Sequence, residues 1–210
     1  MTGLFRFEWQ RCLDGYEAAD FGEPSPGRNP RAPYRIFIRP RSGRIEVFHP
    51  LDIQRALFRQ FAATETSVAA MLGFAESFGL LTHPSDEEPI GLWRASIESM
   101  RTLVAKWTSG RMDEVAEAYN RLNFGNLALR LAHDRRTPWP HLEIVPTKLL
   151  DAMWAQFAQA VSKNERHKAC LRCGAWFAYG PGTGKRNTAI YCSAKCQKAH
   201  QYAKKKVADH

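Results

Sequence analysis

The spacing of apolar residues predicts a chain built mainly from amphipathic helices. In residues 91–109 apolar side chains recur every three or four positions, which places them on one helix face. Gly110 then ends the pattern. Similar spacing predicts helices at 51–63, 67–78 and 113–122, and at 149–161 after a cap at Thr147. Gly79 is expected to cap the helix at 67–78. The inward residues expected for the first and longest of these helices are Ile53, Leu57, Phe58 and Phe61, and Trp93, Ile97, Met100, Val104 and Trp107.

Shorter segments have the composition and alternation of strands. Residues 34–39 and 44–48 are rich in β-branched and aromatic residues and flank a turn at 40–43, so we expect a hairpin. Residues 126–133 alternate between leucine and other residues, which favours a strand over a helix, and residues 141–145 are its expected partner. Residues 20–33 are rich in Pro and Gly and predict a loop.

The first 162 residues show no catalytic spacing. Their aromatic and Met stripes are interpreted as core packing, because amphipathic helices bury such faces. Cys12 stands alone and is expected to be a small buried side chain. The histidines of this region share no spacing with one another. We therefore expect no enzymatic activity from this part of the chain.

Charge is distributed very unevenly along the 210 residues. Residues 163–210 contain eleven Lys and Arg residues but two carboxylates, which gives this segment the net charge of +9 of the whole chain. Residues 1–162 hold 19 basic and 19 acidic side chains and are neutral. A concentrated basic field is typical of proteins that bind a polyanion, most often nucleic acid.

The basic segment also contains four of the five cysteines, within 27 residues. Cys170 and Cys173 form a C-x2-C pair, and Cys192 and Cys196 form a C-x3-C pair one helical turn apart. Zinc in structural sites takes four such thiolates in a tetrahedron. Gly174 suits the tight turn after the first pair, and Ser193 is a good cap for a helix after the second. The spacing predicts that these four cysteines bind Zn²⁺.

The order of elements around these cysteines predicts a treble-clef zinc finger. Strands are expected at 176–179 and 188–191, joined by a turn at 180–187, with a basic helix after Cys192 and a polar linker at 164–168 before the finger. We therefore predict an α+β protein with a mainly helical, regulatory domain at 1–162, which includes small β-hairpins, and the finger at 163–210. His200 lies one turn after Cys196 and could replace a cysteine as ligand, although four thiolates already complete the shell.

The helix expected at about 194–207 carries the residues that we expect to contact duplex DNA. Lysines attract phosphates, whereas Gln197, Gln201 and Arg186 have the chemistry to read bases. The aromatic residues Trp176, Phe177, Tyr191 and Tyr202 could stack on single-stranded bases, or cover the metal and fill a small core. The predicted nucleic-acid contacts are Lys185, Arg186, Lys195, Lys198, Gln201, Lys204, Lys205 and Lys206.

The same residues are compatible with other functions. The finger could be a protein-interaction module with an exposed apolar patch at Trp176 or Phe177, or it could bind RNA through its basic face. Residues 180–185 faintly resemble a phosphate loop, but Tyr179 and Arg186 break that motif. A treble-clef nuclease would need histidines, and none lies between Cys173 and Cys192.

The apolar stretches and the N-terminal segment bear on the cellular compartment of the protein. No stretch approaches 18 uninterrupted apolar residues, so we expect no membrane partner. The N-terminus lacks the basic and apolar regions of a secretory signal, which predicts a cytoplasmic protein whose cysteines are reduced.

The arrangement resembles the bacterial CGNR-type zinc-finger proteins, described as stress-induced transcription regulators. The similar segments are 57–81, 149–161 and the finger motifs C-x-x-C-G-x-x-F and Y-C-S-x-x-C. After Cys196 the chain reads Gln-Lys-Ala, where that family has Gly-Asn-Arg. The resemblance implies DNA binding by the finger, and sensing or homo-oligomerisation by the helical domain.

Overall fold

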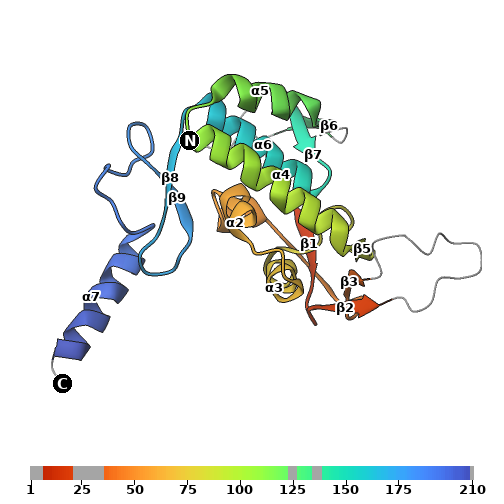
Figure 1. Cartoon of the computed structure of the whole chain (residues 1–210), viewed down its shortest axis with the longest axis horizontal. Helices are drawn as coiled ribbons and strands as arrows, with labels where there is room; N and C mark the ends of the chain where they lie inside the picture. The colour runs from red at the N-terminus through yellow and green to blue at the C-terminus, as the bar shows by residue number, and fades with distance from the viewer. Residues whose placement is uncertain (1–6, 21–35, 123–126, 134–138, 209–210) are drawn as a thin grey trace, which may run out of the picture.

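The computed structural model describes residues 7–20, 36–122, 127–133 and 139–208. It shows a mixed α+β chain, as predicted, in which a helical body is flanked by small antiparallel sheets of two or three strands and a C-terminal helix projects away from the body (Figure 1). The Pro/Gly-rich loop predicted at 20–33 lies outside the described residues, except for Asp20. No helix in the described ranges is both long enough and apolar enough to cross a membrane.

Two pairs of antiparallel strands form a ribbon at the start of the chain. β1 (Trp9–Cys12) pairs with β4 (Ile45–Phe48), β2 (Tyr16–Asp20) pairs with β3 (Ile36–Pro40), and the short β5 (Glu88–Pro89) joins β3. Both segments predicted as a hairpin are strands, but their expected pairing with each other is wrong. The turn expected at 40–43 does not join the two strands as a hairpin: the Arg41 N–H donates to the Gly15 carbonyl and the Leu13 N–H to the Arg44 carbonyl. These bonds continue the pairing with the N-terminal segment.

The helix predicted at 51–63 is divided into α1 (Pro50–Ile53) and α2 (Leu57–Ala63). Gln156 of a later helix explains the division, because its side chain accepts from the Phe58 N–H and donates to the Arg55 carbonyl. It satisfies backbone groups that a continuous helix would pair internally. Leu57, Phe58 and Phe61 are buried as expected, whereas Ile53 is 65% exposed.

The third helix, α3 (Val68–Phe78), ends where predicted and begins one residue after the predicted start, with Ser67 as its N-cap. The Ser67 Oγ accepts a hydrogen bond from the Ala70 N–H at 3.3 Å, and Gly79 follows with φ +85°. The side chain of Glu88 is buried beside this end of the helix and accepts hydrogen bonds from the N–H groups of Leu81, Thr82 and His83. A carboxylate thus holds the turn that follows α3.

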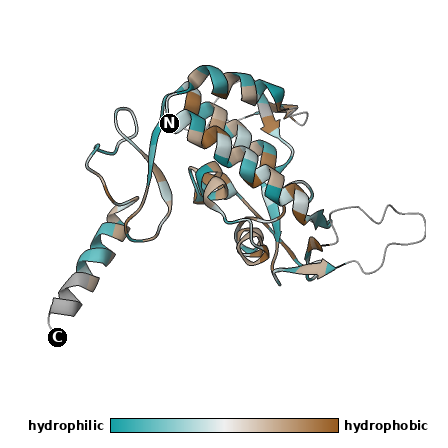
Figure 2. Ribbon diagram, viewed as in Figure 1, coloured by the Kyte–Doolittle hydropathy of each residue, from teal (hydrophilic) through white to brown (hydrophobic). Residues whose placement is uncertain are grey.

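Three further helices complete the body: α4 (Ile90–Thr108), α5 (Met112–Arg121) and α6 (Leu149–Ser162). On α4, Trp93, Ile97, Met100 and Trp107 are buried as predicted, and Val104 is partly buried. Helix α6 begins at Leu149, as predicted, but the cap predicted at Thr147 is wrong, because Lys148 occupies the N-cap position. Figure 2 shows apolar and polar stretches alternating along these helices.

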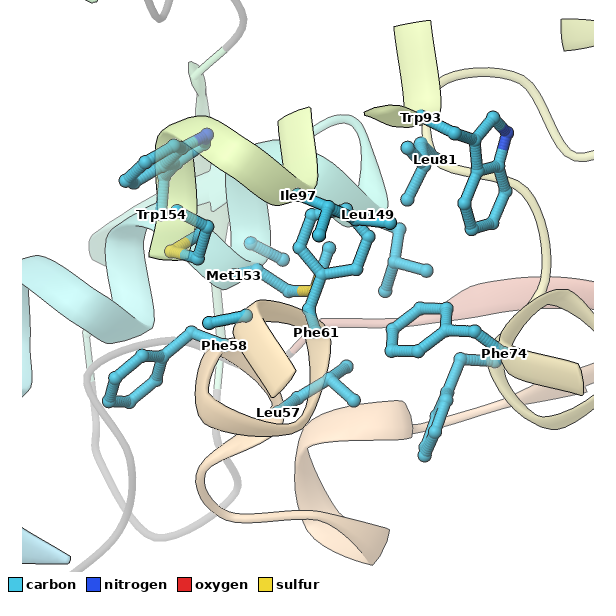
Figure 3. Close-up of a cluster of buried hydrophobic side chains, with 14 of the residues drawn as sticks. Leu57, Phe58, Phe61, Phe74, Leu81, Trp93, Ile97, Leu149, Met153 and Trp154 are labelled. Carbon is cyan, nitrogen blue, oxygen red and sulfur yellow. The ribbon is translucent and has the colours of Figure 1, made fainter. Parts of the chain in front are cut away.

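The core forms where α2, α3, α4 and α6 meet (Figure 3). The ring of Phe61 lies 5.1 Å from that of Phe74 and 6.3 Å from that of Trp93, in edge-to-face geometry. Phe58 makes the same kind of contact with Phe157, at 5.7 Å. Such pairs add to the free energy gained from apolar burial, so the aromatic stripes serve as core, as predicted.

The predicted strands at 126–133 and 141–145 are confirmed as β6 (Leu127–Ala132) and β7 (His141–Pro146). Leu127, Leu129 and Leu131 are 48%, 70% and 73% exposed, and Leu142 opposite Leu131 is 64% exposed. The hairpin therefore presents an apolar face to the surroundings.

Candidate metal centre and basic helix

The first cysteine pair lies at the tip of a hairpin formed by β8 (Arg166–Ala169) and β9 (Trp176–Tyr179). The Cys170 N–H donates to the Ala175 carbonyl at 2.9 Å, and the Gly174 N–H donates to the Cys170 carbonyl at 2.9 Å. Gly174 has φ +72°, which glycine adopts without steric cost. This turn brings the thiols of Cys170 and Cys173 to the same side.

This hairpin differs from the one that the sequence predicts. Most of the expected linker at 164–168 is strand β8, and residues 188–191 form no strand. The partner of β9 thus precedes the first cysteine pair instead of following it. The segment at 188–191 is held by a bond from the Leu171 N–H to the Ile190 carbonyl, at 3.0 Å.

The second cysteine pair lies at the start of α7 (Ala194–Ala208). The Ser193 Oγ accepts from the Cys196 N–H at 3.2 Å, and the Ser193 carbonyl accepts from the Gln197 N–H at 3.1 Å. The predicted cap is therefore confirmed. It fixes Cys192 and Cys196 one turn apart, on the side that faces the hairpin tip.

The four sulfur atoms lie within 4.8 Å of one another. The Sγ–Sγ distances are 3.6 Å for Cys173–Cys192, 3.5 Å for Cys192–Cys196 and 3.7 Å for Cys173–Cys196. A tetrahedral ion with metal–sulfur bonds of about 2.3 Å has sulfur–sulfur edges of about 3.8 Å. The cluster can therefore hold a metal ion with little rearrangement.

The pKa values of these thiols differ. Burial raises the pKa of Cys170, but backbone hydrogen bonds from Cys192, Cys173 and Arg172 outweigh it and bring that pKa to about 6. Burial and the neighbouring sulfurs raise the pKa of Cys192 to about 12. Four adjacent thiolates repel one another unless a cation lies between them, so binding a divalent ion would release protons from this cluster.

His200, the alternative ligand, is not a member of the cluster. Its ring lies 5.5 Å from that of Tyr191. Phe177 is buried, and Trp176 is half-buried and packs against the helical core. Neither ring is therefore fully exposed as the centre of an apolar patch, whereas Tyr202 is 76% exposed.

The predicted nucleic-acid contacts lie on two elements. Lys195, Lys198 and Gln201 are exposed on α7, at intervals of three residues. Lys204, Lys205 and Lys206 belong to the same helix, but their side chains lie outside the described part of the chain. Lys185 and Arg186 lie instead in the loop after β9, where Arg186 is exposed and the Lys185 Nζ lies 5.8 Å from the centre of the Phe177 ring.

The residues that attach the finger to the helical body carry no signal in the sequence pattern. His167 of β8 has a side chain only 1% exposed, with its ring 5.5 Å from that of Phe58 and 6.0 Å from that of Trp107. The Arg59 guanidinium lies 4.7 Å from the Trp107 ring and 5.6 Å from the Trp176 ring. Because His and Arg are usually exposed, their spacing carries no burial signal.

A scan against models of known protein families found no match, and a search of curated proteins found none either. The resemblance to CGNR-type fingers therefore stays a prediction from the motifs alone.

Proposed function

We propose that the protein is a zinc-stabilised DNA-binding protein that works as a transcription regulator through α7. The observation that carries this proposal is the exposed basic face of a helix whose first turn belongs to the thiol cluster. Lys195 and Lys198 project from it, and the described residues after Glu165 include no carboxylate. An isolated helix is marginal in water, so anchoring by metal would keep α7 formed and aimed at a ligand.

Zinc is the ion that best fits the donor set. Four thiolates at tetrahedral spacing are typical of structural zinc sites, and they leave no open position for water or substrate. We therefore propose that the ion holds the fold and takes no part in catalysis. Cys170 and Cys173 would hold it from the hairpin, and Cys192 and Cys196 from the helix.

The helix has the dimensions for a duplex groove. Its 15 residues span about 22 Å, and a helix of this kind fits the major groove of B-DNA. Lysines would neutralise phosphates and give salt-dependent affinity, while Gln201 would be placed to contact base edges.

The test measures bound zinc first and duplex affinity second, at two or more salt concentrations. Changing Lys204, Lys205 and Lys206 to Ala should weaken duplex binding at least about tenfold at low salt and reduce the salt slope by roughly three. The control replaces Arg55, Arg94 and Lys163, which are exposed and lie outside α7 and the loop after β9, so it removes the same charge.

The results separate the proposed function from its alternatives. Equal binding by the triple variant and the parent would contradict contact through α7. Preference for single strands in competition would favour RNA binding by the same face. One zinc per chain without any duplex binding at low salt would favour a protein-interaction module.

A further inference from the structure

The loop between β9 and the start of the second cysteine pair lines a shallow cavity of about 450 Å³. In Figure 1 the chain loops out between β9 and α7. The cavity is lined by Gly180, Pro181, Gly182, Gly184, Lys185, Arg186 and Asn187. No carboxylate is among these residues, and two of them are cationic.

The sign of φ alternates along the backbone of this loop. Gly180, Gly182 and Gly184 have φ of +103°, +78° and +72°, whereas Pro181 and Thr183 between them have negative φ. Backbone N–H groups exposed by turns of this kind can form a concavity that binds anions. Glycine supplies the positive φ at each of the three positions.

The hydrogen bonds within the loop use the N–H groups of Gly180, Thr183 and Lys185 but not those of Gly182 and Gly184. The Gly180 N–H donates to the Lys185 carbonyl at 2.8 Å, and the Thr183 N–H donates to the Gly180 carbonyl at 3.2 Å. The Lys185 N–H donates to the Thr183 Oγ at 3.2 Å. Within the described part of the chain, the N–H groups of Gly182 and Gly184 donate to no acceptor.

We propose that residues 180–187 bind a phosphate group, with the N–H groups of Gly182 and Gly184 as donors and Lys185 and Arg186 as counter-charges. The loop lacks the Walker sequence, but backbone donors do not require that motif. Free phosphate and a backbone phosphodiester of nucleic acid share this chemistry. Binding of free phosphate is independent of the proposed function. Binding of a nucleic-acid phosphodiester rests on the proposed function, and the loop would then add a phosphate contact beside α7.

The first experiment titrates the zinc-loaded full chain with inorganic phosphate and follows the backbone amides by ¹⁵N NMR. Saturable shifts are expected at Gly182 and Gly184, with a smaller response to chloride at equal ionic strength. The variant Gly182→Ala should weaken phosphate binding several-fold, because a Cβ disfavours the positive φ that this residue adopts.

The matched control is Gly110→Ala. Gly110 has the same φ of +78° as Gly182, and an added Cβ meets nothing within 4 Å at either position. It therefore reproduces the backbone strain away from the cavity. For charge, Arg186→Ala is compared with Arg172→Ala, which removes another exposed cation of the finger.

The second experiment repeats duplex binding with the same variants. If the loop contacts a backbone phosphate, Arg186→Ala should lower the salt slope of duplex binding by about one, and Gly182→Ala should weaken duplex binding. Both controls should bind the duplex as the parent does. Phosphate binding without an effect on the duplex would assign the loop to free phosphate. Phosphate binding in a chain that binds no duplex would retain this inference and contradict the proposed function.

The inference is overturned if phosphate shifts neither glycine amide, or if Gly182→Ala binds phosphate as Gly110→Ala does. Duplex binding that depends on the α7 lysines would in that case leave the proposed function intact.

Discussion

At the scale of single residues, Gly79 shows how a local signal and a long-range contact can require the same residue. The helical pattern predicts a glycine where α3 ends, and Gly79 has φ +85° there. A Cβ at this position would lie 2.5 Å from the Gln10 carbonyl oxygen and about 3 Å from the Trp9 ring. The indole N–H of Trp9 donates to the Leu80 carbonyl in the next turn. Gly79 therefore both ends a helix and admits strand β1.

The substitution Gly79→Ala should lower the free energy of unfolding by roughly 2–5 kcal/mol, because it adds overpacking to the strain of positive φ. The substitution Gly110→Ala introduces the strain of positive φ without overpacking, and should lower the free energy of unfolding by about 1 kcal/mol. Denaturant unfolding of both variants measures the difference. Equal losses would show that β1 yields to the added methyl group.

At the scale of elements, the β6–β7 hairpin has one face without charge. Its cross-strand pairs on that face are Leu127–Pro146, Leu129–Ile144 and Leu131–Leu142. The leucines of this face are about half to three-quarters exposed. Identical apolar faces are self-complementary, and residues 1–162 are neutral, so two copies could meet here without charge repulsion. We expect a second copy of the chain to cover this face.

Changing Leu129 and Leu131 together to Thr keeps strand propensity and removes apolar area from both copies. The dissociation constant of the dimer should rise at least about tenfold, from the lost burial of four side chains. Light scattering and sedimentation over a concentration series measure it. Val47→Thr, at an exposed position of β4, should leave the mass unchanged. A parent chain that stays monomeric at every concentration would contradict the expectation.

At the scale of the whole molecule, His167 and Arg59 connect the two parts of the chain. Burial and the nearby Arg59 charge lower the pKa of His167 to about 4, and its Nε2 lies 3.5 Å from the Glu165 carboxylate. The unfolded chain binds this proton below about pH 6.5, whereas the folded chain does not until about pH 4. Stability is therefore complete above pH 6.5 and falls as the pH drops toward 4.

The loss assigned to His167 should be on the order of 3 kcal/mol across that window. His167→Phe keeps an aromatic ring among Phe58 and Trp107 without a titrating group. The difference in unfolding free energy between parent and variant should thus depend on pH, while metal release affects both alike. NMR titration gives a direct measurement: His167 ring signals that titrate near pH 6.5 would contradict the burial of this side chain.

Most of the fold and the cysteine cluster could be predicted because their signals are local in sequence. The face of α4, the ends of α3 and the spacing of the two cysteine pairs each lie within a few turns of chain. The pairing of β8 with β9 could not be predicted, because Arg166 and Lys168 are polar and their spacing reads as a linker. Their partners, Tyr179 and Phe177, lie beyond the cysteine turn.

By itself, the sequence determined the helical character of the body, the four thiols and the concentration of the net charge of +9 in one segment. These follow from periodicity, spacing and composition. The tertiary structure alone decided which strands pair across residues 21–35, where Gln156 divides a helix, and how His167 becomes buried beside Arg59. It also decided that the loop after β9 forms a cavity with free donors. Each of these depends on groups that meet only when the chain folds, or on backbone dihedral angles. The pattern of side chains along the sequence specifies neither.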